Sequence, residues 1–293
     1  MNLGLLNACL MAWNPSRIAG FAREEGFSAL ELHGGPRYTA ASWSEVAAGS
    51  RDAVMAIREP LEQNNLTCSG IMFGNLPYLD ADPAKRTEAA EYLSMLIRAA
   101  ANLDIPVVST FTGRAVELDL EGNIERFKMV FTPIAEQAER AGVTVAFENC
   151  AMTGGFKPAT NIAYSPDIWK LIFDAVPSSN LGLNFDPSHL QWMGADVVAA
   201  VREFGKRIVH VQAKDAEVIP NRLASSTILA DGWWRYRIPG YGDVPWVGFF
   251  SALREVGYVG TVSIEHEDPV FEGSDEKIID GLRRAASFLT PYL

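Results

Sequence analysis

Acidic residues end three strand-like segments of this chain. The segments VTVAFE, LGLNFD and TVSIE place Glu148, Asp186 and Glu265 last. In each segment bulky apolar residues alternate with small or polar ones, so the acid shares a face with the polar residues. We predict that the apolar faces pack outward against helices and that the three carboxylates converge at one end of a sheet.

A fourth segment, RIVHVQAKD, carries polar residues of other kinds. A two-residue period puts Ile208, His210, Gln212 and Lys214 on the inward face. Gln212 lies nearer than His210 to the carboxyl end of the strand, where the acids gather. We predict that the side-chain oxygen of Gln212 approaches a bound ion and that His210 lies one layer deeper. The alternative is that His210 itself is the ligand.

Three carboxylates in one small cavity need compensating positive charge, because an unpaired buried charge is costly. Lys214, Arg237 and Lys157 could supply it. A divalent metal ion is the favoured explanation. Mostly oxygen ligands plus an imidazole suit Mn²⁺, Mg²⁺ or Co²⁺ better than a thiolate-type zinc site, and we take Mn²⁺ as the first choice.

Strand-like and helix-like patterns alternate along the whole chain. This predicts a single α/β domain, residues 1–293, folded as a (β/α)₈ TIM barrel whose active site lies at the carboxyl ends of the strands. A doubly wound open sheet is the alternative, but no glycine-rich loop follows the first strand. The segment 213–246 is too long for a simple helix, so an elaborated loop is expected after strand seven. The strands are predicted at 3–7, 28–32, 67–71, 107–110, 143–148, 181–186, 208–212 and 261–265, and the helices at 15–25, 43–64, 83–102, 124–140, 166–175, 195–204 and 275–289.

The charge and composition of the chain limit its possible binding partners and its location. The net charge of −11 argues against nucleic acid and against an anionic membrane surface as a partner. Three widely spaced cysteines do not suggest a disulfide framework, and no apolar run reaches the ~18 residues of a membrane span. The amino terminus lacks the basic region of a signal peptide. We expect a cytoplasmic protein. It could form a homo-oligomer, either a dimer or a tetramer.

Five motifs carry a resemblance to a known family. AFEN (146–149), NFDPSHL (184–190), VHVQAKD (209–215), IPGYGDVPW (238–246) and SIEHED (263–268) resemble the xylose-isomerase-like barrels of the sugar phosphate isomerase/epimerase family, especially ketose 3-epimerases. The resemblance implies one divalent ion held by Glu148, Asp186, Glu265 and a histidine. Where the family has the second histidine of a His-x-His pair, this chain has Gln212.

The resemblance also implies roles around the substrate. His189 matches a contact to substrate or metal-bound water, Arg237 a contact to a substrate oxygen, and Lys214 with Asp215 a pair common in the group. His210 and Glu31 complete the candidate substrate-binding residues. Glu31 and His33 face inward by parity and could instead form a structural ion pair. The pair Trp233 and Trp234 is either loop core or a platform for a sugar ring.

The expected activity is a metal-dependent sugar isomerase or epimerase. Glu148 and Glu265 are the expected catalytic residues: they would move a proton beside a carbonyl through an enediolate. No cluster of lysines and arginines marks a phosphate pocket, so an unphosphorylated keto-sugar is the expected substrate. The runner-up is a lyase that eliminates a group from a 3-keto-sugar or keto-glycoside at the same site. A non-catalytic sugar-binding barrel is a weaker alternative, and a DNA-repair endonuclease would need more histidines than four.

Overall fold

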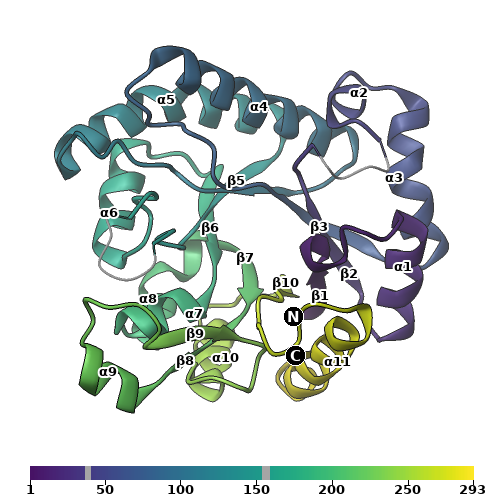
Figure 1. Cartoon of the computed structure of the whole chain (residues 1–293). Coiled ribbons are helices and arrows are strands. Elements are labelled where there is room, and N and C mark those ends of the chain that lie inside the picture. The colour runs from purple at the N-terminus through teal and green to yellow at the C-terminus, as the bar shows by residue number, and fades with distance from the viewer. Residues whose placement is uncertain (37–40, 154–158) are drawn as a thin grey trace.

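Eight parallel strands close into a barrel in the computed structural model, which describes residues 1–36, 41–153 and 159–293. Around the barrel the strand order is β1-β10-β7-β6-β5-β4-β3-β2, so the first and last strands pair and the two termini lie close together (Figure 1). The predicted (β/α)₈ barrel is confirmed. The strands are β1 Asn2–Leu6, β2 Ala29–His33, β3 Thr67–Met72, β4 Val107–Thr110, β5 Thr144–Glu148, β6 Leu181–Phe185, β7 Ile208–Ala213 and β10 Thr261–Ile264.

Helices surround the barrel on its outer side (Figure 1). They are α1 Pro15–Glu24, α2 Trp43–Ala47, α3 Arg51–Gln63, α4 Pro83–Asn102, α5 Leu120–Ala141, α6 Pro166–Ala175, α7 Pro187–Met193, α8 Val197–Phe204, α9 Pro220–Ser226, α10 Trp246–Glu255 and α11 Asp275–Leu289. Across the described ranges, none of these helices is long and apolar enough to cross a membrane.

The predicted helix at 43–64 is two helices. Gly49 adopts a left-handed φ of 77° between α2 and α3, which ends the first helix. Ser50 then caps α3 by accepting a hydrogen bond from Ala53 N. The helices α7 and α10 were not predicted. In α7, Asp186 is the N-cap and Pro187 the first residue, so a short helix starts inside the NFDPSHL motif.

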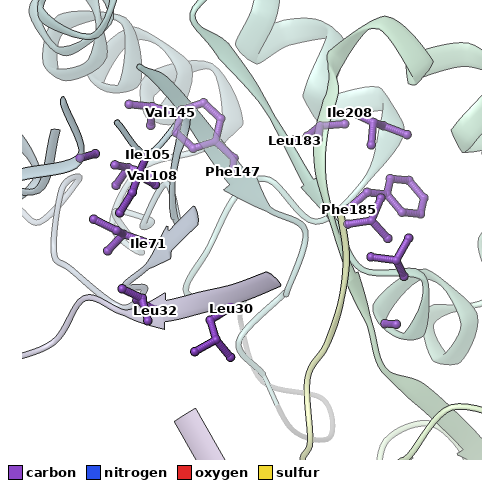
Figure 2. Packing of buried hydrophobic residues seen from close by; sticks show 14 of the residues in the cluster. Leu30, Leu32, Ile71, Ile105, Val108, Val145, Phe147, Leu183, Phe185 and Ile208 are labelled. Carbon is purple, nitrogen blue, oxygen red and sulfur yellow. The ribbon is translucent and has the colours of Figure 1, made fainter. Parts of the chain in front are cut away.

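The outer face of the strands is apolar, as their alternation predicts. Figure 2 shows Leu30, Leu32, Val145 and Phe147, among other strand side chains, in the buried hydrophobic core. Burial of this face against the helices drives barrel formation. The polar residues of the same strands are therefore left for the interior.

The strand β7 departs from the predicted alternation at its start. Ile208 was expected on the inward face, but it pairs with Leu183 of β6 and belongs to the hydrophobic core (Figure 2). The register shifts directly after this pair, so Asn184 is opposite His210. Val209 occupies the space beside Gly182, where a side chain on residue 182 would collide with it. One irregular residue thus turns the rest of the strand, from His210 onward, to the predicted face.

The elaborated loop after β7 is an antiparallel hairpin. Its strands β8 (Asp215–Val218) and β9 (Trp234–Arg237) pair with each other outside the barrel, and α9 lies between them in the chain. The hairpin packs beside α7 at the lower edge of the molecule (Figure 1). The expected insertion at 213–246 is therefore an ordered element.

Candidate active site

Three carboxylates meet at the carboxyl ends of β5, β6 and β10. One oxygen each of Glu148, Asp186 and Glu265 lies within 4.8 Å of the other two. The side chains of two buried asparagines bond to the backbone of Glu148 and Asp186 and hold these two acids in place. Asn149 Nδ2 donates to Asp186 O at 2.8 Å and its Oδ1 accepts from Asp186 N at 2.8 Å, while Asn161 Nδ2 donates to Glu148 O at 3.0 Å. The structure thus brings together the three acids that strand parity singled out.

Lys214 contacts two of these acids directly. Its Nζ lies 2.8 Å from Glu265 Oε2, 2.9 Å from Glu267 Oε2 and 3.3 Å from Asp186 Oδ2. Burial disfavours its charge, yet these carboxylates hold the pKa of Lys214 well above its usual range. Lys214 therefore stays protonated and compensates part of the negative charge. Lys157, the third candidate cation, lies outside the described residues.

The acids respond differently to this environment. Burial and the neighbouring Glu148 and Glu267 raise the pKa of Glu265, although Lys214 opposes the rise. Burial acts in the same direction on Asp186, but contacts with His189 and Lys214 lower its pKa to about 2. These contacts favour the charged form of Asp186, whereas burial favours the protonated form of Glu265.

His189 lies at the centre of the site. Its Nε2 is 3.0 Å from Glu148 Oε1 and 3.2 Å from Asp186 Oδ2, and its Nδ1 is 3.0 Å from the hydroxyl of Tyr236. The ring is fully buried. His189 therefore contacts two of the predicted metal ligands directly.

Gln212 and His210 have hydrogen-bond partners other than the three acids. Gln212 Nε2 donates to both carboxylate oxygens of Glu31 at 3.3 Å. His210 Nδ1 is 3.0 Å from Asn184 Oδ1, and its Nε2 is 3.1 Å from Ser69 Oγ. Burial lowers the pKa of His210 to about 4 and raises that of Glu31 to about 8, so both groups favour their neutral forms.

Two candidates point elsewhere. Arg237 Nε donates to Asp268 Oδ2 at 2.8 Å and its Nη1 to Glu217 Oε2 at 2.6 Å, and the residue does not line the cavity above the acids. His33 Nδ1 accepts from Gly35 N at 3.2 Å, while Glu31 contacts Gln212 instead. Asp215 accepts backbone hydrogen bonds from Gly240, Gly242 and Val244.

A cavity of about 330 Å³ opens above the acids. Its walls carry the charged residues Glu148, Glu265 and Lys214 together with apolar side chains. Sequence reasoning missed several of these wall residues because loops and strand ends bring them together from distant segments. The missed lining residues are Met72, Phe111, Cys150, Met152, Thr153 and Tyr236. Trp234 was considered as a sugar platform, and Glu267 belongs to the SIEHED motif.

The donor set suits a divalent cation. Glu148 Oε2 and Gln212 Oε1 are buried oxygens that have no hydrogen-bond partner. A buried acceptor without a partner is costly, and a bound cation would satisfy it. Together, Glu148, Asp186 and Glu265 offer only oxygen, which hard divalent ions prefer.

The sequence comparison identifies the family. Residues 19–291 match the family described as xylose isomerase-like TIM barrel. The chain belongs to this family. Among its relatives, YfiH of Bacillus subtilis (strain 168) is 36% identical over 146 residues, which cover 46% of this chain and 44% of YfiH. The chain therefore matches less than half of that relative's length.

Other members of this xylose isomerase-like family have named activities. An inosose dehydratase of Clostridium tetani (strain Massachusetts / E88) is 24% identical over 225 residues, 73% of this chain and 74% of the relative. A solved D-psicose 3-epimerase with D-fructose superposes over 100% of this chain and 99% of its own, with a TM-score of 0.75 and 17% identity. The IOLI protein with a bound zinc atom gives a TM-score of 0.75 at 19% identity, covering 100% of this chain and 99% of its own. These two structures are similar in fold.

Proposed function

We propose that this protein is a divalent-metal-dependent sugar isomerase or epimerase that acts on an unphosphorylated keto-sugar. The observation that carries the proposal is the cluster of Glu148, Asp186 and Glu265 within 4.8 Å, with buried oxygens on Glu148 and Gln212 left without partners. Glu148, Asp186, Gln212 and Glu265 would hold the ion, with Mn²⁺ as the first choice and Mg²⁺ or Co²⁺ as alternatives. The zinc atom in the IOLI structure supports a divalent ion in this type of barrel.

The bound ion would act as a Lewis acid that stabilises negative charge on the substrate oxygens when a proton beside the carbonyl is removed. The protein's own residues move that proton. Glu265 has a raised pKa, which suits a carboxylate that takes up a proton near neutral pH. Glu148 would donate or accept a proton on the opposite face of the substrate. The positive charge of Lys214 offsets part of the negative charge of the three carboxylates. Return of the proton to the opposite face of the same carbon gives epimerisation, and return to the neighbouring carbon gives isomerisation.

A lyase is the second candidate. If a leaving group stands beside the carbon that loses its proton, the same two glutamates support β-elimination. The relationship to an inosose dehydratase over 73% of this chain favours this candidate.

The proposed substrate-binding residues are the same for both reactions: His189, Lys214, His210, Glu31 and Arg237. Because Arg237 is bonded to Asp268 and Glu217, its role would require that it leave these partners.

Proton exchange in deuterated water tests the proposal. The protein, loaded with Mn²⁺, is incubated with a panel of keto-sugars and cyclic polyol ketones, and deuterium incorporation is followed by mass spectrometry after the ion is removed. Incorporation in at least one compound, absent with a Glu148→Gln/Glu265→Gln variant, is the expected result. The recovered product then distinguishes epimer, isomer and eliminated ketone. A metal-loaded protein that exchanges no proton in the panel and changes none of the compounds contradicts the proposal.

A further inference from the structure

Tyr236 reaches the active site from outside the barrel. Tyr236 belongs to β9 of the inserted hairpin, where it is opposite Ala216 of β8. The alternation of the strand puts Trp234 and Tyr236 on the side that lines the cavity. Arg235 and Arg237 both bond to Glu217 on the other side. The hairpin therefore presents the Tyr236 side chain to the acids.

The hydroxyl of Tyr236 holds one edge of the His189 ring. It lies 3.0 Å from Nδ1, while the Tyr236 ring lies 4.5 Å from Lys214 Nζ. The opposite edge of the imidazole faces Glu148 Oε1 at 3.0 Å and Asp186 Oδ2 at 3.2 Å. Ionised carboxylate oxygens only accept hydrogen bonds, so Nε2 must carry a proton. Both ring nitrogens of His189 therefore have partners: Tyr236 at Nδ1, and Glu148 and Asp186 at Nε2.

We propose that Tyr236 is a positioning residue for Glu148, acting through His189. Its hydroxyl fixes the rotation of the imidazole, so that Nε2–H donates to Glu148 Oε1. Glu148 then has one oxygen held by His189 and one, Oε2, without a hydrogen-bond partner. An outer partner of this kind orients a group that contacts the reacting atoms. The importance for turnover rests on the proposed role of Glu148 as a catalytic residue.

The test removes only the hydroxyl. Tyr236→Phe keeps the aromatic ring and its contact with Lys214. In the Mg²⁺-loaded wild-type protein we expect a slowly exchanging Nε2–H signal from His189 in ¹H–¹⁵N spectra, assigned with His189→Gln among only four histidines. In Tyr236→Phe this signal should broaden or disappear. The rate of substrate proton exchange should fall by ~10–100-fold with little change in KM.

A matched control comes from the same insertion. Tyr241→Phe removes a hydroxyl that accepts from Arg284 Nη1 at 2.9 Å, away from the acids, and should leave the His189 signal and the exchange rate unchanged. An unaltered Nε2–H signal in Tyr236→Phe, or a wild-type ring that is unprotonated at Nε2, overturns the inference. The spectrum does not depend on turnover. A protein that exchanges no sugar proton therefore contradicts the proposed function, while the His189 signal still decides the role of Tyr236.

Discussion

The two glutamates assigned to proton transfer lie in different surroundings. Glu148 is bonded to His189, whereas Glu265 is bonded to Lys214 and has a raised pKa. The substrate would lie between a carboxylate whose position is fixed by an imidazole and one whose proton affinity is adjusted by an ammonium group. The two residues are therefore not interchangeable, although both come from barrel strands that end in an acid.

Replacing either glutamate with glutamine should remove turnover. Glu148→Gln and Glu265→Gln each retain shape but cannot accept a proton, so the rate of substrate proton exchange should fall by at least ~10²–10⁴-fold. Glu276→Gln, an exposed substitution in the first turn of α11, is the control and should retain the wild-type rate. Wild-type exchange in either site variant would rule out the two-base mechanism.

The assignment of Gln212 to the metal can be tested against His210. Gln212→His should tighten Mn²⁺ binding, because imidazole is a stronger ligand than an amide oxygen, and Gln212→Ala should weaken it. His210→Ala should leave the affinity nearly unchanged and cost about 1–3 kcal/mol of stability, because Asn184 and Ser69 lose a buried partner. Titration with Mn²⁺ and chemical unfolding measure the two effects. Loss of the ion in His210→Ala, with retention in Gln212→Ala, would make His210 the ligand.

At the scale of elements, one buried carboxylate organises the insertion after β7. Asp215 accepts hydrogen bonds from Ala216 N, Gly240 N, Gly242 N, Val244 N and Trp246 Nε1, at 2.8 to 3.1 Å. The backbone of the IPGYGDVPW motif is thus wrapped around a single side chain. This explains why an aspartate directly follows Lys214 without itself lining the cavity.

Asp215→Asn should therefore destabilise the protein. The amide group places a donor where at least one backbone N–H now donates, so the unfolding free energy should fall by about 1–3 kcal/mol. Chemical denaturation measures this loss, with Asp231→Asn, an exposed position of the same insertion, as the control. Equal stability of Asp215→Asn and wild type would contradict this role.

The local sequence determined some elements better than others. Pro83 and Asp82 mark the start of α4, and Gly142 marks the end of α5, so those boundaries follow from residue chemistry. The apolar pattern from Trp43 to Asn64 predicts one helix. The left-handed backbone of Gly49, seen in the structure, divides this segment into α2 and α3. Strand alternation located Glu148 in the same way that it located the apolar core.

At the scale of the whole molecule, the site depends on contacts that sequence spacing cannot supply. The contact between Gln212 and Glu31 joins residues 181 positions apart, and that between Tyr236 and His189 joins residues 47 positions apart. Both depend on barrel closure and on the path of the hairpin. Strand parity could predict that Gln212 faces inward, but not which inward neighbour its amide would contact.

Metal loading should stabilise the entire barrel, because the predicted ligands come from four of its strands or strand ends. We expect one Mn²⁺ per chain after loading and desalting, and a gain of about 2.7 kcal/mol in unfolding free energy at a free ion concentration 100 times Kd. Elemental analysis measures the number of Mn²⁺ ions per chain, and thermal unfolding measures the gain in stability. A Glu148→Gln/Asp186→Asn/Glu265→Gln variant should bind no ion. A wild-type protein that retains no Mn²⁺ or Co²⁺ would contradict the metal site.

The anchoring by Asp215 has a consequence for how this barrel can diversify. Asp215 joins the two ends of the insertion, and Ile219 N donates to Trp233 O at 2.7 Å across the outer part of the hairpin. Residues 220–232 thus form an excursion that is closed on itself before the chain returns to the barrel. A segment of this kind can change in length and composition without disturbing the barrel strands that carry Glu148, Asp186 and Glu265.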